Sequence, residues 1–118
     1  DIKELDLGNN NLTDISGIKL FKNLEILWLN KNKLTDISVL KNLNSLKKLY
    51  LWKNKIQDIS FIKDLNNLKL LDIGFLELES NQIKYINKCK NLEDLLCYKG
   101  FKDMSIINKI NNNIILSD

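Results

Sequence analysis

Residues 24–45 read LEILWLNKNKLTDISVLKNLNS, and residues 46–67 repeat the pattern as LKKLYLWKNKIQDISFIKDLNN. The two stretches agree at their apolar positions and at the asparagines Asn32 and Asn54. Residues 2–23, IKELDLGNNNLTDISGIKLFKN, follow the same pattern and carry Asn10. Three copies at one fixed spacing predict a repeat architecture, in which each unit buries its apolar face against its neighbours.

The first part of each unit, LxxLxLxxN, has apolar residues with a period of two, which is typical of a short β-strand with one buried face. Such a strand has no stable partner within its own unit, so we expect it to pair in parallel with the same strand of the next unit. The amide of the following asparagine can both donate and accept hydrogen bonds. The sequence therefore predicts a buried structural ladder formed by Asn10, Asn32, Asn54 and Asn81.

The second part of each unit, TDISxLKNL, has apolar residues at every third position, which favours a tight 3₁₀ turn or irregular coil over a full α-helix. An aspartate precedes a serine by two residues in four units, where side-chain oxygens can cap free N–H groups. These aspartates are Asp14, Asp36, Asp58 and Asp103. A strand on one side and a turn on the other predict a right-handed solenoid.

The motif LxxLxLxxNxLTDISxLxxL at this spacing resembles bacterial leucine-rich repeats of the internalin type. It also resembles the related 22-residue subclass found in phosphatase-regulator proteins. The resemblance implies an α/β fold, with a concave parallel β-sheet and a 3₁₀ or irregular convex side, in a single domain over residues 1–118. It further implies a protein partner on the concave face and a bacterial surface or secreted location. An intracellular scaffold or regulatory subunit is the alternative.

The pattern breaks in the fourth unit. Counting from Leu68 places Leu71 and Ile73 correctly but puts Leu76 where asparagine is expected, whereas counting from Ile73 recovers Asn81. We predict the second register because it keeps the asparagine. The predicted units are 2–23, 24–45, 46–72, 73–91 and 92–112, followed by a partial terminal unit. Neither end shows a polar capping unit, so the chain is expected to be part of a longer protein or to be covered at its ends.

Residues between the strand leucines point away from the core, and in the predicted register they form an aromatic cluster between lysines and carboxylates. Contiguous exposed aromatic patches are typical of binding sites. Mutual packing of the rings is the alternative. The candidate partner-binding residues are Trp28, Asn30, Tyr50, Trp52, Phe75, Glu77, Glu79 and Tyr98, with Lys31 and Lys53 beside them.

Composition argues against several other functions. The 118 residues include 18 lysines, no arginine and 15 acidic residues, and this bias toward Lys, Asn and Ile is typical of an AT-rich genome. The modest charge of +3 argues against nucleic acid as the partner, although lysines beside aromatic rings would suit single strands. The chain has no histidine, so we expect no enzyme, no cofactor and no metal site; Glu77 and Glu79 are the only candidate cation-binding or acid/base pair.

Apolar runs are too short to predict a membrane span. Cys89 and Cys97 are too few for a disulfide framework, and we expect buried free thiols, with a bridge between them as the alternative. The predicted partner is a protein whose identity the sequence does not specify.

Overall fold

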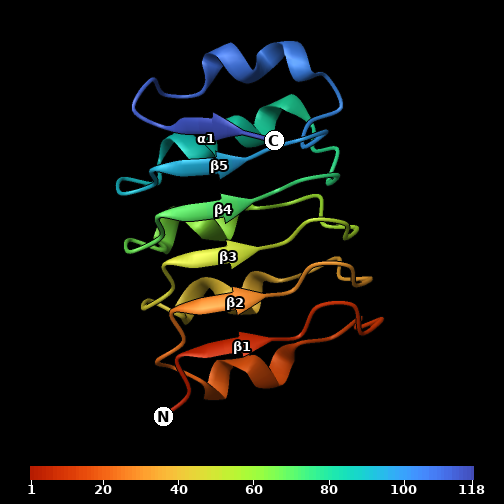
Figure 1. The fold of residues 1–118 in the computed structure, drawn as a ribbon, viewed down its shortest axis with the longest axis vertical. Coiled ribbons are helices and arrows are strands. Elements are labelled where there is room, and N and C mark those ends of the chain that lie inside the picture. Colours follow the sequence, from red (N-terminus) through yellow and green to blue (C-terminus); the bar gives the residue numbers. More distant parts are fainter.

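The computed structural model describes all 118 residues and contains one six-stranded parallel sheet, with the strands in sequence order. Figure 1 shows them stacked from β1, near the N-terminus, upward. The strands are β1 (Glu4–Asp6), β2 (Ile26–Trp28), β3 (Lys48–Tyr50), β4 (Leu70–Asp72), β5 (Asp94–Leu96) and β6 (Ile115–Ser117). Each strand pairs only with the strands of adjacent units, so the sheet stays open at both edges.

Short helical turns line the other side of the molecule, as the three-residue periodicity predicted. The 3₁₀ turns are η1 (Ser16–Leu20), η2 (Ser38–Asn42), η3 (Ser60–Asp64), η4 (Ser80–Gln82) and η5 (Met104–Lys109), and the one α-helix is α1 (Ile83–Asn87). The predicted solenoid of parallel strands and 3₁₀ turns is confirmed. No helical segment has the length and hydrophobicity that a membrane span requires.

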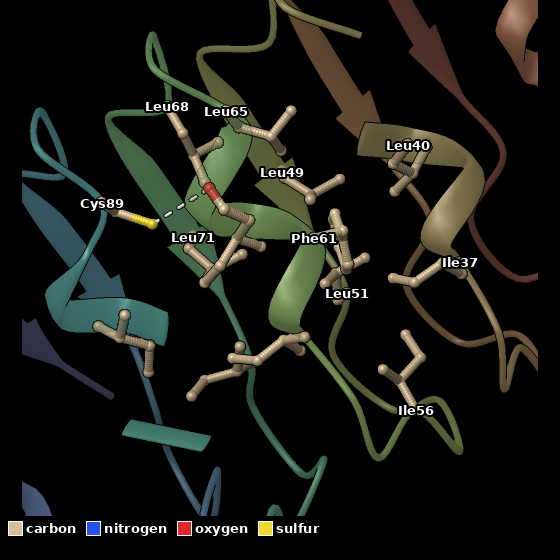
Figure 2. Close-up of a cluster of buried hydrophobic side chains, with 14 of the residues drawn as sticks. Ile37, Leu40, Leu49, Leu51, Ile56, Phe61, Leu65, Leu68, Leu71 and Cys89 are labelled. Carbon is tan, nitrogen blue, oxygen red and sulfur yellow. Dashed lines mark hydrogen bonds between the residues drawn. The ribbon is translucent and has the colours of Figure 1, made fainter. Parts of the chain in front are cut away.

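A single core runs the length of the solenoid. Thirty-two buried hydrophobic residues form one cluster, and the central leucine of each inner strand is fully buried (Leu27, Leu49, Leu71 and Leu95). Figure 2 shows part of this cluster around η3. An aspartate just before η1, η2, η3 and η5 on the convex side bonds to the backbone of the serine at or near the start of each turn: Asp36 Oδ1 accepts a hydrogen bond from Ser38 N at 2.9 Å. Asp14, Asp58 and Asp103 make the same bond to the serine two residues on.

Asn32 and Asn54 hold adjacent units together. Asn54 Nδ2 donates to Leu29 O and Leu51 O at 2.9 Å each, and its Oδ1 accepts from Leu34 N at 3.0 Å. Asn32 makes the same set of bonds one unit earlier. Asn10 is exposed: its side-chain amide donates to Leu7 O and Gly8 O of its own unit, and its backbone N–H donates to Asn32 Oδ1.

The fourth unit follows the register that was not chosen from the sequence. Leu71 pairs with Leu49 on one side and Leu95 on the other, so this unit begins at Leu68 and not at Ile73. The predicted boundary between 46–72 and 73–91 is therefore wrong, and the units are 46–67 and 68–91. Leu76, at 2% exposure, takes the ladder position, and Asn81 is exposed outside it.

The reason for this register is the balance of burial against hydrogen bonds. This register buries Leu68, Leu71 and Ile73 completely, and each such side chain stabilises the fold by about 2 kcal/mol. The three hydrogen bonds of one ladder asparagine contribute about 1 kcal/mol net each. The leucines of the fourth unit therefore stay aligned with those of its neighbours, and no asparagine occupies the ladder position in this unit. The backbone N–H of Ile56, which corresponds to those of Leu12 and Leu34, consequently has no acceptor in the chain.

The fourth unit is also longer than the others, since its paired leucines, Leu71 and Leu95, lie 24 positions apart. The extra residues lie on the convex side, where η4 continues directly into α1. A buried glutamine there supplies a different link between units, because Gln82 Oε1 accepts from Ile59 N at 2.8 Å. Sequence reasoning did not anticipate this residue.

Both cysteines are free and buried. Cys89 Sγ donates to Ile62 O at 3.4 Å (Figure 2), and burial raises the pKa of this thiol to about 12. Burial also raises the pKa of Cys97, with Asp118 and Asp72 adding to the effect.

Because only the thiolate is nucleophilic, we expect both cysteines to resist an aromatic disulfide reagent at pH 8 in the folded protein. Absorbance should report two reactive thiols once the chain is unfolded in guanidinium chloride. Rapid labelling of the native chain would contradict the burial of these side chains.

Candidate functional site

The register of the sheet sets three rows of side chains that point away from the core: one at the first residue of each strand, from Glu4 to Ile115, and two that carry aromatic residues. The first of these two rows is formed by the last residue of each strand and contains Asp6, Trp28, Tyr50, Asp72, Leu96 and Ser117. The second lies just beyond the strand ends, where the backbone pairing continues, and contains Gly8, Asn30, Trp52, Gly74 and Tyr98. Asn30 is half-buried and its side chain makes no hydrogen bond within the chain.

Trp28 and Tyr50 form a stacked pair on this face. Their ring centroids lie 5.5 Å apart with an interplanar angle of 5°, and both side chains are half-buried. Cross-strand aromatic contacts of this kind add about 0.2–1 kcal/mol of stability. This pair therefore contributes to packing while it leaves an apolar surface open to solvent.

Phe75 and Tyr98 form a second aromatic pair, edge to face, with centroids 5.3 Å apart. The sequence analysis placed Phe75 on a strand, and this is wrong. Phe75 follows β4 and has a left-handed backbone, at φ 58°. The residues at the same place in the other units are Asn9, Lys31, Lys53 and Lys99, all with positive φ. A bulky aromatic residue is rarely found in this conformation, and such strain is concentrated at functional sites.

A cavity of about 390 Å³ separates Trp52 from Tyr98. Its lining residues are Trp52, Asp72, Gly74, Phe75, Leu96, Tyr98 and Asp118. Gly74 is the reason for the gap, because it lies between Trp52 and Tyr98 in the second row and has no side chain. A Cβ atom there would lie 3.3 Å from Trp52 Cβ and 3.2 Å from Asp72 Oδ1.

Asp72 is the carboxylate beside this gap. Its Oδ1 accepts a hydrogen bond from Gly74 N at 2.9 Å, and it makes no salt bridge. Burial raises the pKa of Asp72 above its ordinary value, and the bond from Gly74 N opposes this effect only in part. The free protein therefore carries a partly desolvated acid without a counter-ion.

Lysines cover the same aromatic rings from the row that contains Phe75. The Nζ of Lys31 lies 5.1 Å from the ring centroid of Trp52, that of Lys53 lies 5.3 Å from Phe75, and that of Lys99 lies 5.6 Å from Tyr98. Cation–π contacts at exposed positions stabilise by about 0.5–1 kcal/mol each. The predicted lysines Lys31 and Lys53 are thus in contact with the aromatic residues, and Lys99 joins them.

The predicted register required Glu77 and Glu79 to face outward from a strand, but they do not lie on one. They lie in the segment after β4, where Leu78 bridges to Phe101, and Glu79 forms an exposed salt bridge of 2.6 Å with Lys102. The hydrogen bond to Glu79 raises the pKa of Lys102. The structure contains no group of three acidic, cysteine or histidine side chains that could hold a metal ion.

Sequence reasoning missed Asp72 and Gly74 because of the error in the fourth register, and it did not consider Asp118, which follows β6. Counting from Leu68 places Asp72 in the row of Trp28 and Tyr50, and Gly74 in the row of Trp52. The spacing of the leucines was therefore the signal that could have identified Asp72 and Gly74. The structure divides the predicted aromatic patch into a stacked pair and a cavity.

Comparison with known proteins places this geometry in context. A family model described as leucine-rich repeats, in two copies, matches residues 2–42. An internalin (inlF) from Listeria monocytogenes superposes on 98% of this chain with a TM-score of 0.84 and 30% sequence identity. The chain is thus similar to internalins and has their leucine-rich-repeat fold.

The internalin-like chain is also similar to internalin C2 from Listeria monocytogenes, with a TM-score of 0.77 and 28% identity over 98% of its length. It spans 34% of the first internalin chain and 51% of the second. No curated protein gave a significant sequence match. The predicted internalin-like resemblance is confirmed.

Proposed function

We propose that this leucine-rich-repeat chain is a protein-interaction module that binds its partner on the concave face of the sheet. The observation that carries the proposal is the group of aromatic side chains on that face: Trp28, Tyr50, Trp52, Phe75 and Tyr98. Phe75 and Tyr98 expose 37% and 46% of their surface. Tryptophan and tyrosine in contiguous apolar patches are the residues that dominate binding energy at protein interfaces.

Two further features support a binding role for this face. Phe75 has an unfavourable left-handed backbone and yet presents its ring to solvent, so the position is not optimised for stability alone. Lys31, Lys53 and Lys99 border the rings with positive charge. A partner with carboxylates at matching positions would associate faster and in one orientation.

The likeness to internalins supports a bacterial surface or secreted location as part of this proposal. An intracellular scaffold remains the alternative location. Catalysis is not part of the proposal, because the chain has no histidine and its cysteine thiols are buried and protonated. Nucleic acid is not proposed as a partner either, since the small net charge would supply little phosphate attraction.

The test is a comparison of partner capture by the wild type and by a Trp28→Ala/Trp52→Ala double variant. Partners recovered on immobilised wild type would be identified, purified and titrated against both proteins. We expect the double variant to bind at least about 100-fold more weakly, because two hot-spot side chains are lost.

A matched control keeps the test specific to this face. Leu20→Ala/Tyr85→Ala removes one exposed and one half-buried apolar side chain from the convex side, at η1 and α1. Circular dichroism should show that both double variants are folded. Equal affinity of the wild type and the tryptophan variant, or a loss confined to the convex control, would refute binding on the concave face.

A further inference from the structure

We infer that the cavity between Trp52 and Tyr98 receives a lysine or arginine side chain of the partner protein, held between the aromatic rings and the carboxylate of Asp72. This inference rests on the proposed function and specifies the chemistry that the partner must present. Its basis is the shape of the cavity, the sign of the charges that line it, and the absence of any counter-ion from the chain itself.

The shape suits one inserted side chain. The cavity is open to solvent, and its volume of about 390 Å³ lies at the small end of the range of ligand-binding clefts, about 300–1,000 Å³. Trp52 and Tyr98 stand on either side of Gly74, whose missing side chain leaves the space between them. Phe75 and Leu96 complete the apolar part of the lining, so the stem of a long side chain would be desolvated while its head reaches Asp72.

The charged groups that line the cavity are both acidic, namely Asp72 and Asp118. Neither takes part in a salt bridge, although the chain contains 18 lysines. The two salt bridges of the structure, Lys47–Glu25 and Lys102–Glu79, lie outside the cavity. A half-buried carboxylate without a counter-ion is unfavourable in the free protein, and a cation from the partner would relieve that cost.

The nearby lysines sharpen the inference further. Lys31, Lys53 and Lys99 contact the rings of Trp52, Phe75 and Tyr98, but none of the three lines the cavity. They leave Asp72 available, and their charges disfavour basic residues of the partner at every place on this face except beside Asp72 and Asp118. The partner should therefore present a single basic side chain with acidic residues next to it.

Nuclear magnetic resonance titration tests this pocket without knowledge of the partner. The probe is a blocked tripeptide, Glu-Arg-Glu, and the matched control is the same peptide with citrulline, which has nearly the shape of arginine without its charge. We expect the arginine peptide to shift the Trp52 indole and Gly74 amide signals saturably, with a dissociation constant on the order of millimolar. The citrulline peptide should bind about tenfold more weakly.

Two variants separate Asp72 from the general acidity of the face. Asp72→Asn keeps the acceptor for Gly74 N and should bring arginine binding down to the citrulline level. Asp6→Asn is the matched control, because Asp6 lies in the same row as Asp72 but far from the cavity, and its Oδ1 likewise accepts a hydrogen bond from Gly8 N at 2.9 Å. The Asp6→Asn variant should bind the arginine peptide as the wild type does. The Trp28 indole, stacked on Tyr50, serves as a second reporter outside the cavity.

Equal binding of the citrulline peptide, equal binding by Asp72→Asn, or shifts centred on Trp28 would each overturn the inference. Tetramethylammonium chloride is a further probe, and its binding without that of the arginine peptide would assign the cavity to a small quaternary ammonium ligand instead. These outcomes leave the proposed function separately testable, because a concave-face partner whose affinity depends on Trp28 and Trp52 but not on Asp72 would retain that function and refute only this pocket.

Discussion

Replacement of Asn54 by alanine is expected to lower the free energy of unfolding by about 4 kcal/mol. The amide bonds two backbone carbonyls, Leu29 O and Leu51 O, and the N–H of Leu34, and all three bonds are buried. Alanine would leave Leu51 O and Leu34 N without partners, at a cost of about 1–3 kcal/mol for each buried unsatisfied group, whereas Leu29 O keeps its bond from Asn32 Nδ2. Urea denaturation followed by circular dichroism measures the change.

Asn30→Ala is the matched control for Asn54. Asn30 is half-buried at the strand end, and its side chain makes no hydrogen bond within the chain. Its replacement should change the unfolding free energy by less than about 0.5 kcal/mol. A loss below about 1.5 kcal/mol for Asn54→Ala would mean that water replaces the amide and that the ladder is not a main source of stability.

Phe61→Ala is the second substitution with a large expected effect, again about 4 kcal/mol. Phe61 is 5% exposed and belongs to the cluster around η3 in Figure 2, with Leu49, Leu51 and Ile37. Loss of the ring removes apolar burial and leaves a cavity that the surrounding backbone cannot close fully. Thermal and urea unfolding should both report the change.

The repeat supplies an internal series at this position. Val39, the equivalent residue one unit earlier, is half-buried, and Val39→Ala should cost only about 1 kcal/mol. Gly17, the equivalent in the first unit, has open space around the place where a Cβ atom would lie, so Gly17→Ala should be neutral or slightly stabilising. Similar losses at Phe61 and Val39 would argue that η3 is no better packed than η2.

The regular units could be predicted closely because a single signal governs them. The leucines of units 2–23, 24–45 and 46–67 recur at one spacing, and the strands, turns and aspartate caps follow from it. The register of the fourth unit was predicted wrongly because the position of the asparagine and the spacing of the leucines favoured different registers. The predicted register favoured the asparagine at residue 81, whereas the fold favours continuous burial of Leu71 and Ile73.

The candidate site was predicted in part for the same reason. Trp28, Tyr50 and Trp52 lie in regular units, and their outward direction follows from the two-residue period of a strand. Phe75 lies on the same face although it is not on a strand, because its backbone is left-handed. The spacing of the apolar residues does not predict this conformation. The cavity depends on a side chain that is missing at Gly74, and the predicted register did not place Gly74 in the row of Trp52 and Tyr98.

The register of the first four strands also bears on how the chain folds. Leu5, Leu27, Leu49 and Leu71 pair in succession, so each contact closes a loop of one repeat, whatever the length of the array. Relative contact order therefore falls as units are added. We expect folding to nucleate in the central units and to spread outward, with a rate that changes little when a whole repeat is inserted or removed.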